Sequence, residues 1–183
     1  MVLLVGSFAC QNKSEDNLHI IIPGIGYDKF LIDSTKLSDI TSLYGDNYMI
    51  DTVKWPDPFD TLQVFCINYS YDKLGVTFKF YPNSRNLKRI SLTTPFQGTT
   101  YKKIILGEST FRQIVKNYGY EKWSYIGNLK SDPIAISKHY DGIYFNQDFP
   151  KGLKYDDKMP DKYLDEYLDC KVTSIDIVKI MNK

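Results

Sequence analysis

Hydrophobic positions along the chain follow a helical spacing twice. Two segments place apolar residues at i, i+3 and i+7: Leu37, Ile40 and Tyr44 in the first, and Phe111, Ile114 and Tyr118 in the second. This spacing puts the three side chains on one helical face. Capping candidates precede each segment, Ser34 or Thr35 and Glu108 or Ser109, and Gly45 and Gly119 follow. Because short amphipathic helices are marginal alone, each is expected to pack on another element.

Runs rich in β-branched and aromatic residues follow each predicted helix and predict strands. They cover 47–52, 62–69, 74–81 and 87–94 in the first half, and 123–126, 134–140, 142–147 and 172–180 in the second. From Leu74 to Tyr81, apolar residues alternate with more polar ones, which is typical of a sheet with one buried face. The predicted fold class is therefore α+β, with a short helix packed on an antiparallel sheet in each half.

The two halves also resemble each other residue by residue. Residues 30–45 align with 104–119 without a gap, and residues 71–78 resemble 140–145 once two residues are deleted. An internal repeat of this length indicates a duplicated unit. We expect two tandem repeats, 17–95 and 96–183, and an insertion at 149–170 that contains one short helix near 163–168.

The second copy carries the clearest family resemblance. Leu106-Gly107-Glu108-Ser109, followed by Ile114 and by Tyr118-Gly119, resembles the helix-opening and helix-closing pattern of small outer-membrane lipoproteins that share the beta-lactamase inhibitor protein fold. The first copy departs from that pattern at Asp33, where the glycine would stand. The resemblance implies a concave sheet surface, formed by two units side by side, that holds a partner protein or peptide.

The N-terminus predicts a lipid anchor. Residues 1–9 form an uncharged apolar run that suits a signal peptide, and residues 4–10 resemble a lipobox whose Cys10 is acylated. Residues 10–16 would then be the lipidated cysteine and a polar tether. Phe8 is bulkier than usual there, and no basic residue precedes the run, which a start upstream of Met1 would explain. The alternative is a buried first strand in which Cys10 is an ordinary thiol.

Charge and motifs argue against nucleic acid and catalysis. The chain holds 23 basic and 22 acidic residues scattered through both halves, so we expect no nucleic-acid surface. Its two histidines, His19 and His139, lack companions at metal-ligand spacing, and no phosphate loop or nucleophile elbow appears. We expect no enzyme, no cofactor and no metal. Cys66 and Cys170 could pair in an exported chain, or Cys66 could be a small buried hydrophobe.

Aromatic residues supply the candidate contact surface. The chain has 15 tyrosines, and the residues expected on strands or at strand ends are Tyr69, Tyr71, Tyr81, Trp123, Tyr125 and Tyr144. Exposed aromatics dominate binding hot spots, but the alternative is that they pack the sheet against its helices. The sequence thus predicts a periplasmic or surface-exposed envelope lipoprotein that binds a protein or envelope component. A sharper form is an inhibitor or immunity protein, and the alternative is a structural accessory subunit of an envelope assembly.

Overall fold

The computed structural model describes residues 18–56, 62–126, 135–148 and 165–180, and these form a mixed α+β fold. The first half contains β1 (His19–Ile22), β2 (Gly26–Tyr27), β3 (Phe30–Leu31), α1 (Leu37–Tyr44), β4 (Met49–Pro56), β5 (Leu62–Tyr71), the 3-10 turn η2 (Asp72–Leu74), β6 (Val76–Phe80) and β7 (Arg89–Thr93). The second contains β8 (Gly98–Thr100), α2 (Phe111–Tyr118), β9 (Trp123–Ile126), β10 (Ala135–Tyr140), β11 (Ile143–Asp148), the 3-10 turn η3 (Asp165–Asp169) and β12 (Ser174–Val178). The expected signal peptide, Cys10 and tether lie outside the described residues.

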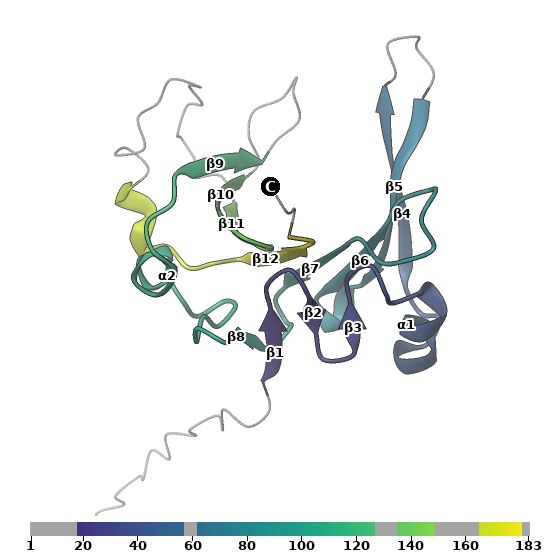
Figure 1. The fold of residues 1–183 in the computed structure, drawn as a ribbon, viewed down its shortest axis with the longest axis horizontal. Coiled ribbons are helices and arrows are strands. Elements are labelled where there is room, and N and C mark those ends of the chain that lie inside the picture. The colour runs from purple at the N-terminus through teal and green to yellow at the C-terminus, as the bar shows by residue number, and fades with distance from the viewer. Residues whose placement is uncertain (1–17, 57–61, 127–134, 149–164, 181–183) are drawn as a thin grey trace, which may run out of the picture.

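One eight-stranded sheet runs through the molecule. Its order is β4-β5-β6-β7-β12-β11-β10-β9, and every neighbouring pair is antiparallel. The order is therefore symmetric, because each half contributes four consecutive strands and the last strand of each half meets the other at the centre. We call this β7·β12 pairing the seam; it places Leu92 opposite Ile175 and Ile90 opposite Ile177. Figure 1 shows the sheet curving, with its two ends rising on either side of the seam.

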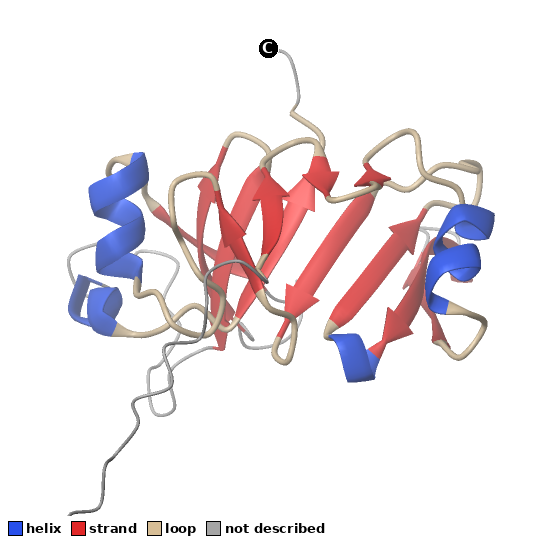
Figure 2. Ribbon diagram, turned by 90° about the horizontal axis from the view of Figure 1, so that it is seen from below, coloured by secondary structure: helices blue, strands red, loops and turns tan. Residues whose placement is uncertain are grey.

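A second, smaller sheet has the order β3-β2-β1-β8 and joins the two halves again. Its β1·β8 pairing is parallel, with Ile20 opposite Thr99. The turn after β1 also reaches the second half, where the Gly24 N–H donates to the Gly142 carbonyl at 2.9 Å. As Figures 1 and 2 show, this sheet lies in the middle of the convex side of the large sheet, with α1 and α2 at the two ends.

The hydrophobic core lies between the convex face of the large sheet and these covering elements. Phe78 of β6 contacts Phe30 and Tyr44 with ring centroids 5.0 and 6.2 Å apart, which fixes the small sheet and α1 on the same face. Tyr118 of α2 contacts Phe145 of β11 in the same way at 5.3 Å. The predicted apolar helix positions Ile40 and Ile114 are both fully buried. Among the described residues, no helix has the length and apolarity that crossing a membrane requires.

Most predicted strands lie where the alternation placed them, but the predicted helix caps were wrong. The N-cap residues are Lys36 and Thr110, one position after Thr35 and Ser109. The Thr35 and Ser109 hydroxyls instead accept the N–H groups of Leu31 and Ile105, at 2.7 and 2.9 Å. They close the turn that leads into each helix, so they are not available to cap its first turn.

Candidate functional site

The concave face of the large sheet is polar, in contrast to its convex face. Strand register places Ser91 of β7 opposite Asp176 of β12, Asp176 opposite Tyr144 of β11, and Tyr144 opposite His139 of β10. The intervening residues Ile90, Ile175 and Phe145 are fully buried on the other side. This alternation assigns the two faces without ambiguity. The concave face therefore carries the side chains that the core does not use.

Asp176 is the centre of a hydrogen-bonded network at the seam. Its carboxylate, which is only 8% exposed, accepts from the Arg89 guanidinium at 2.5 Å, from Asn146 Nδ2 at 2.8 Å and from the Ser91 hydroxyl. Asn146 also donates to the Ser174 hydroxyl at 3.1 Å. The network links β7, β12 and β11 and so spans the junction between the halves. Buried networks of this kind hold their members in one arrangement.

Arg89 and two aromatic rings stand over this network. Burial by itself lowers the pKa of Arg89, but the charge of Asp176 and its hydrogen bond outweigh burial, so the pKa is raised and the guanidinium stays charged. Arg89 lies 5.7 Å from the centroid of the Tyr144 ring. That ring is stacked on His139 at 3.9 Å and 5°. Burial lowers the pKa of His139, which favours a neutral imidazole at neutral pH.

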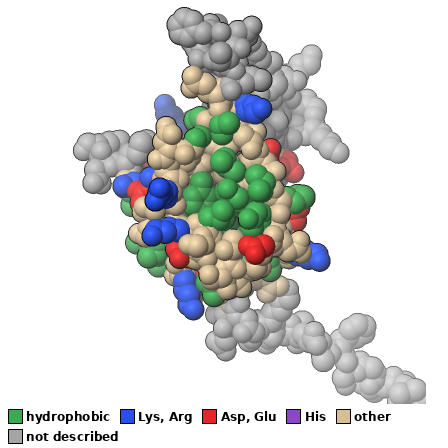
Figure 3. Space-filling view, turned by 90° about the vertical axis from the view of Figure 1, so that its right-hand side faces the viewer, with side chains coloured by type: hydrophobic (Ala, Val, Ile, Leu, Met, Phe, Trp, Pro, Cys, Tyr) green, Lys and Arg blue, Asp and Glu red, His purple; other side chains and the backbone are tan. Residues whose placement is uncertain are grey.

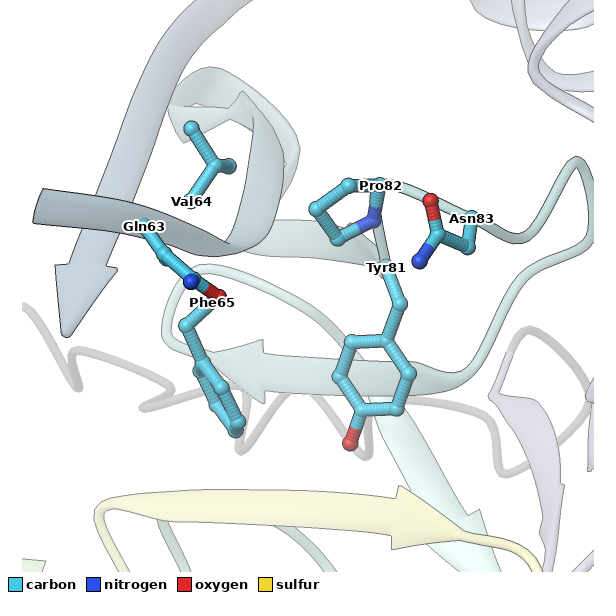
Figure 4. Close-up of a pocket in the computed structure, with 6 residues that line it drawn as sticks. All are labelled: Gln63, Val64, Phe65, Tyr81, Pro82 and Asn83. Atoms are coloured by element: carbon cyan, nitrogen blue, oxygen red, sulfur yellow. The ribbon is translucent and has the colours of Figure 1, made fainter. Parts of the chain in front are cut away.

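An aromatic pocket lies at the other end of the concave face. Phe65 and Tyr81 are 47% and 43% exposed, and their ring centroids are 5.6 Å apart. Figure 4 shows both rings pointing the same way along an open pocket of about 650 Å³, whose other lining residues are Gln63, Val64, Pro82 and Asn83. Phe65 is the unpaired residue of a bulge, since Val53 pairs with Cys66 while Lys54 pairs with Val64. A bulge re-aims the side chains beside it.

The structure separates the six aromatic residues predicted as contacts. Tyr81 and Tyr144 lie on the concave face. Tyr71 is 4% exposed and its hydroxyl donates to the Gly45 carbonyl at 2.8 Å, so it is a core residue and that prediction was wrong. Tyr69 is half-buried and packs on Phe80 at 5.6 Å from the core side. Trp123 and Tyr125 belong to β9, opposite Lys138 and Ile136, and the structure describes only their backbone.

The environments of Cys66, Cys170 and His19 are those of structural residues. Cys66 is buried and Cys170 is half-buried, and both thiols are free. Burial raises the pKa of the Cys66 thiol, which makes it less reactive. His19 Nδ1 lies 2.5 Å from an Asp28 oxygen, and its ring stacks on Phe96 at 5.0 Å. Within the described ranges, no three His, Cys, Asp or Glu side chains gather as a metal site would need.

An apolar patch lies at the β4 edge of the large sheet. Figure 3 shows hydrophobic side chains gathered on the side of the molecule where α1 and β4 lie. The large apolar residues exposed in these two elements are Leu43, Met49 and Ile50, at 52%, 61% and 61%. β4 is an edge strand, so its outer backbone groups pair with no strand of the described sheet.

The seam network and the aromatic pocket were not predicted from the sequence. The seam network does leave a pattern there, because Arg89 and Ser91 alternate with buried residues in one strand, as Ser174 and Asp176 do in another. Arg89 faces Val178 and Asp176 faces Ser91, so the two charges are diagonal neighbours on one face, and they predict a pair once the two closing strands are known to be adjacent. The bulge at Phe65 leaves no comparable pattern in the sequence.

No known protein family, curated protein or solved structure matches this chain.

Proposed function

We propose that this protein is a non-catalytic, lipid-anchored binding protein of the bacterial envelope, built from two copies of one α+β unit. Its partner, a protein or an envelope component, contacts the concave face of the sheet. The observation that carries the proposal is the composition of that face: exposed aromatic rings stand around a fixed, buried polar network. The central polar groups bind one another, an arrangement that suits a rigid surface better than proton transfer.

Corresponding hydrogen bonds in the two halves support a duplication. Leu87 N–H donates to Thr35 O at 2.8 Å, and Val172 N–H donates to Ser109 O at 3.0 Å. The Asp33 N–H donates to Leu87 O at 2.8 Å, as the Gly107 N–H does to Val172 O at 3.1 Å. These bonds connect the turn before each helix to the start of each closing strand. The alignment of residues 30–45 with 104–119 pairs Asp33 with Gly107 and Thr35 with Ser109.

The ends of the helices correspond in the same way. The Tyr71 hydroxyl donates to Gly45 O and the Tyr140 hydroxyl to Gly119 O, each at 2.8 Å. Both glycines have positive φ, 75° and 96°. Two long-range side-chain bonds at equivalent positions are hard to attribute to shared strand geometry alone. They favour descent of both halves from one unit, as in tandem beta-lactamase-inhibitor-like lipoproteins.

Exposed aromatic rings on a preorganised surface suit recognition of a partner. Tyrosine and phenylalanine offer large contact area with few rotatable bonds, so little conformational entropy is lost when they are covered. Arg89 adds a charged group that is already held in place by Asp176, and this lowers the cost of ordering it on binding. An inhibitor or immunity protein that blocks a secreted enzyme or toxin is the sharper form of the proposal.

Affinity capture with surface variants tests the proposal. The full chain, extracted in mild detergent, is used to capture envelope partners that are identified by mass spectrometry. Capture should fall at least about tenfold for the double variant Tyr81→Ala/Tyr144→Ala, since hot-spot aromatics contribute strongly. The matched control is Tyr101→Ala, because Tyr101 is 63% exposed and belongs to the loop between β8 and α2. Equal capture by wild type and the double variant would contradict binding through the concave face.

A further inference from the structure

The concave face carries two cations directly opposite each other. Lys79 of β6 pairs in register with Arg89 of β7, and both alternate with buried residues, Phe78 and Phe80 beside one and Ile90 beside the other. Like charges at directly opposite positions of antiparallel strands destabilise a sheet. Asp176 compensates Arg89, but Lys79 has no ion pair within the described part of the chain.

The other groups around Lys79 do not neutralise it by contact. Its register partner on β5 is Asn68, and the next residue outward is Asp51 of β4. The Asp51 carboxylate accepts a hydrogen bond from Asn68 Nδ2 at 3.3 Å. Cys66 lies near enough to Lys79, Arg89 and Asp51 for their charges to act on its pKa, but burial raises that pKa and keeps the thiol neutral. The concave face therefore retains Lys79, a half-exposed cation, beside Arg89, which is paired with Asp176.

The aromatic pocket lies next to this cation along the same strand direction. Tyr81 follows Lys79 by two residues, and Phe80 between them is buried, so Lys79 and Tyr81 point to the same side. Two residues of extended chain span about 7 Å. Tyr81 and Tyr144 both lie close enough to Arg89 to influence its pKa, which places the pocket, the cations and Tyr144 on one continuous surface.

We propose that the concave face binds an extended segment of a partner protein that presents an acidic side chain two residues from an aromatic one. The carboxylate contacts Lys79 and the outer edge of Arg89, and the aromatic ring enters the pocket and packs against the Phe65 and Tyr81 rings that line it. In an extended segment, side chains two residues apart project from the same face with the spacing of Lys79 and Tyr81. The inference rests on the proposed function and specifies the chemistry of its partner.

Charge complementarity and the chemistry of the pocket both favour this kind of partner. The pocket lining is mostly apolar, its polar groups being the amides of Gln63 and Asn83 and the Tyr81 hydroxyl, so it accepts an uncharged ring. A carboxylate beside it would relieve the repulsion between Lys79 and Arg89. A basic segment would instead bring a third positive charge to the same place.

Panning a display library of random short peptides against the full chain in mild detergent tests the inference. Enriched peptides should carry Asp or Glu two residues from Trp, Tyr or Phe. The best of them, made synthetically, should bind about tenfold more weakly to Lys79→Glu and to Tyr81→Ala, and binding should weaken as salt rises. The matched controls are Lys29→Glu, an exposed residue of the β2–β3 turn on the convex side, and Tyr101→Ala. Denaturant unfolding checks that each variant is folded.

The outcomes separate this inference from the function on which it rests. Failure to enrich any peptide, enrichment of peptides without an acidic residue, or unchanged binding to Lys79→Glu would overturn the inference. If the Tyr81→Ala/Tyr144→Ala variant still loses its captured envelope partner, the proposed function stands while the acidic-aromatic chemistry fails. If neither that variant nor Lys79→Glu changes any binding, both fail.

Discussion

Asp33 shows how one residue can meet a backbone requirement and an electrostatic one together. Its φ is 65°, close to the 77° of Gly107 at the equivalent position in the second half. Aspartate tolerates this left-handed conformation better than most residues do. Its carboxylate accepts from Lys88 and Lys179, each at 2.6 Å. The departure from the glycine pattern noted in the sequence is therefore a change of residue without a change of backbone shape.

We predict that Asp33→Asn makes stability less dependent on pH in the acid range. The hydrogen bonds from Lys179 and Lys88 lower the pKa of Asp33 below its ordinary value of 3.8. Its ionised form therefore stabilises the fold fully above pH 3.8, and this contribution is lost as pH falls through the lower, folded-state pKa. The variant should be less stable at neutral pH by up to about 1 kcal/mol, because the pairs are partly exposed. Denaturant unfolding at neutral and strongly acid pH measures this, and an equal deficit at both would contradict it.

The Tyr71 hydroxyl provides a second prediction about a single residue. Tyr71→Phe should lower the free energy of unfolding by about 0.5–1.5 kcal/mol, because the Gly45 carbonyl loses its donor while the ring still packs. Tyr140→Phe, which removes the corresponding bond to Gly119, should cost a similar amount. Tyr101→Phe is the control, since Tyr101 is mostly exposed. Urea unfolding of the three variants checks this, and a neutral Tyr71→Phe would show that the bond contributes nothing net.

The two helices differ in how their first turns are capped. The Thr110 hydroxyl accepts from Gln113 N–H at 3.4 Å, and Gln113 Oε1 accepts from Thr110 N–H at 2.8 Å. In α1 the Asp39 carboxylate accepts from Lys36 N–H at 2.8 Å, but Lys36 supplies no cap in return. Half of a capping box is thus missing from α1.

Lys36→Thr should therefore stabilise the protein. The backbone of Lys36 already has the extended conformation of an N-cap, with φ −98° and ψ 162°, almost that of Thr110. A threonine there should gain about 0.5–1 kcal/mol in the free energy of unfolding, and Thr110→Ala should lose about 1 kcal/mol. Thermal and urea unfolding measure both. A Lys36→Thr variant no more stable than wild type would refute the comparison of the helices.

Elements with their own periodicity could be predicted from the sequence, and those made by tertiary pairing could not. The aromatic-rich run at 123–126 predicted β9 at its observed bounds, and the i, i+3, i+7 spacing predicted both helices. β2 and β3 have two residues each and β8 has three, too few for a pattern. The alternation around Phe78 defined two faces of the sheet. That Tyr69 and Tyr71 lie on the core face became clear only from the register, which pairs them with Phe78 and Val76. The Arg89–Asp176 pair could not be predicted for the same reason, because the sequence alone does not show that β7 and β12 are neighbours.

At the scale of the whole molecule, the seam holds the halves together through a buried charge. Asp176→Ala should lower the free energy of unfolding by about 2–3 kcal/mol, because it leaves Arg89 without its counter-ion and removes an acceptor from Ser91 and Asn146. Ser174→Ala is the milder comparison, since it removes only a neutral bond to Asn146. Chemical denaturation measures both. Equal effects of the two substitutions would mean that the charge at the seam is unimportant.

The proposed lipid anchor at Cys10 lies outside the residues that the structure describes. We predict that Cys10→Ser moves the protein from the membrane fraction to the soluble fraction, because the acyl chains proposed for that residue would supply the membrane affinity. Cys170→Ser should leave fractionation unchanged. Immunoblots of the two fractions compare them, together with the intact mass of the purified chains. Continued membrane association of Cys10→Ser would reject the lipid anchor.

The position of the seam also determines the order in which the chain can fold. The β4–β5, β5–β6 and β6–β7 hairpins join near neighbours in sequence, whereas β7 must wait for β12, which follows it much later in the sequence. Closing so large a loop is slow compared with hairpin formation. Until it closes, β7 has a bare edge at the middle of the future sheet, where another chain's strand could add. This unfinished edge must therefore be kept from other chains until β12 pairs with it.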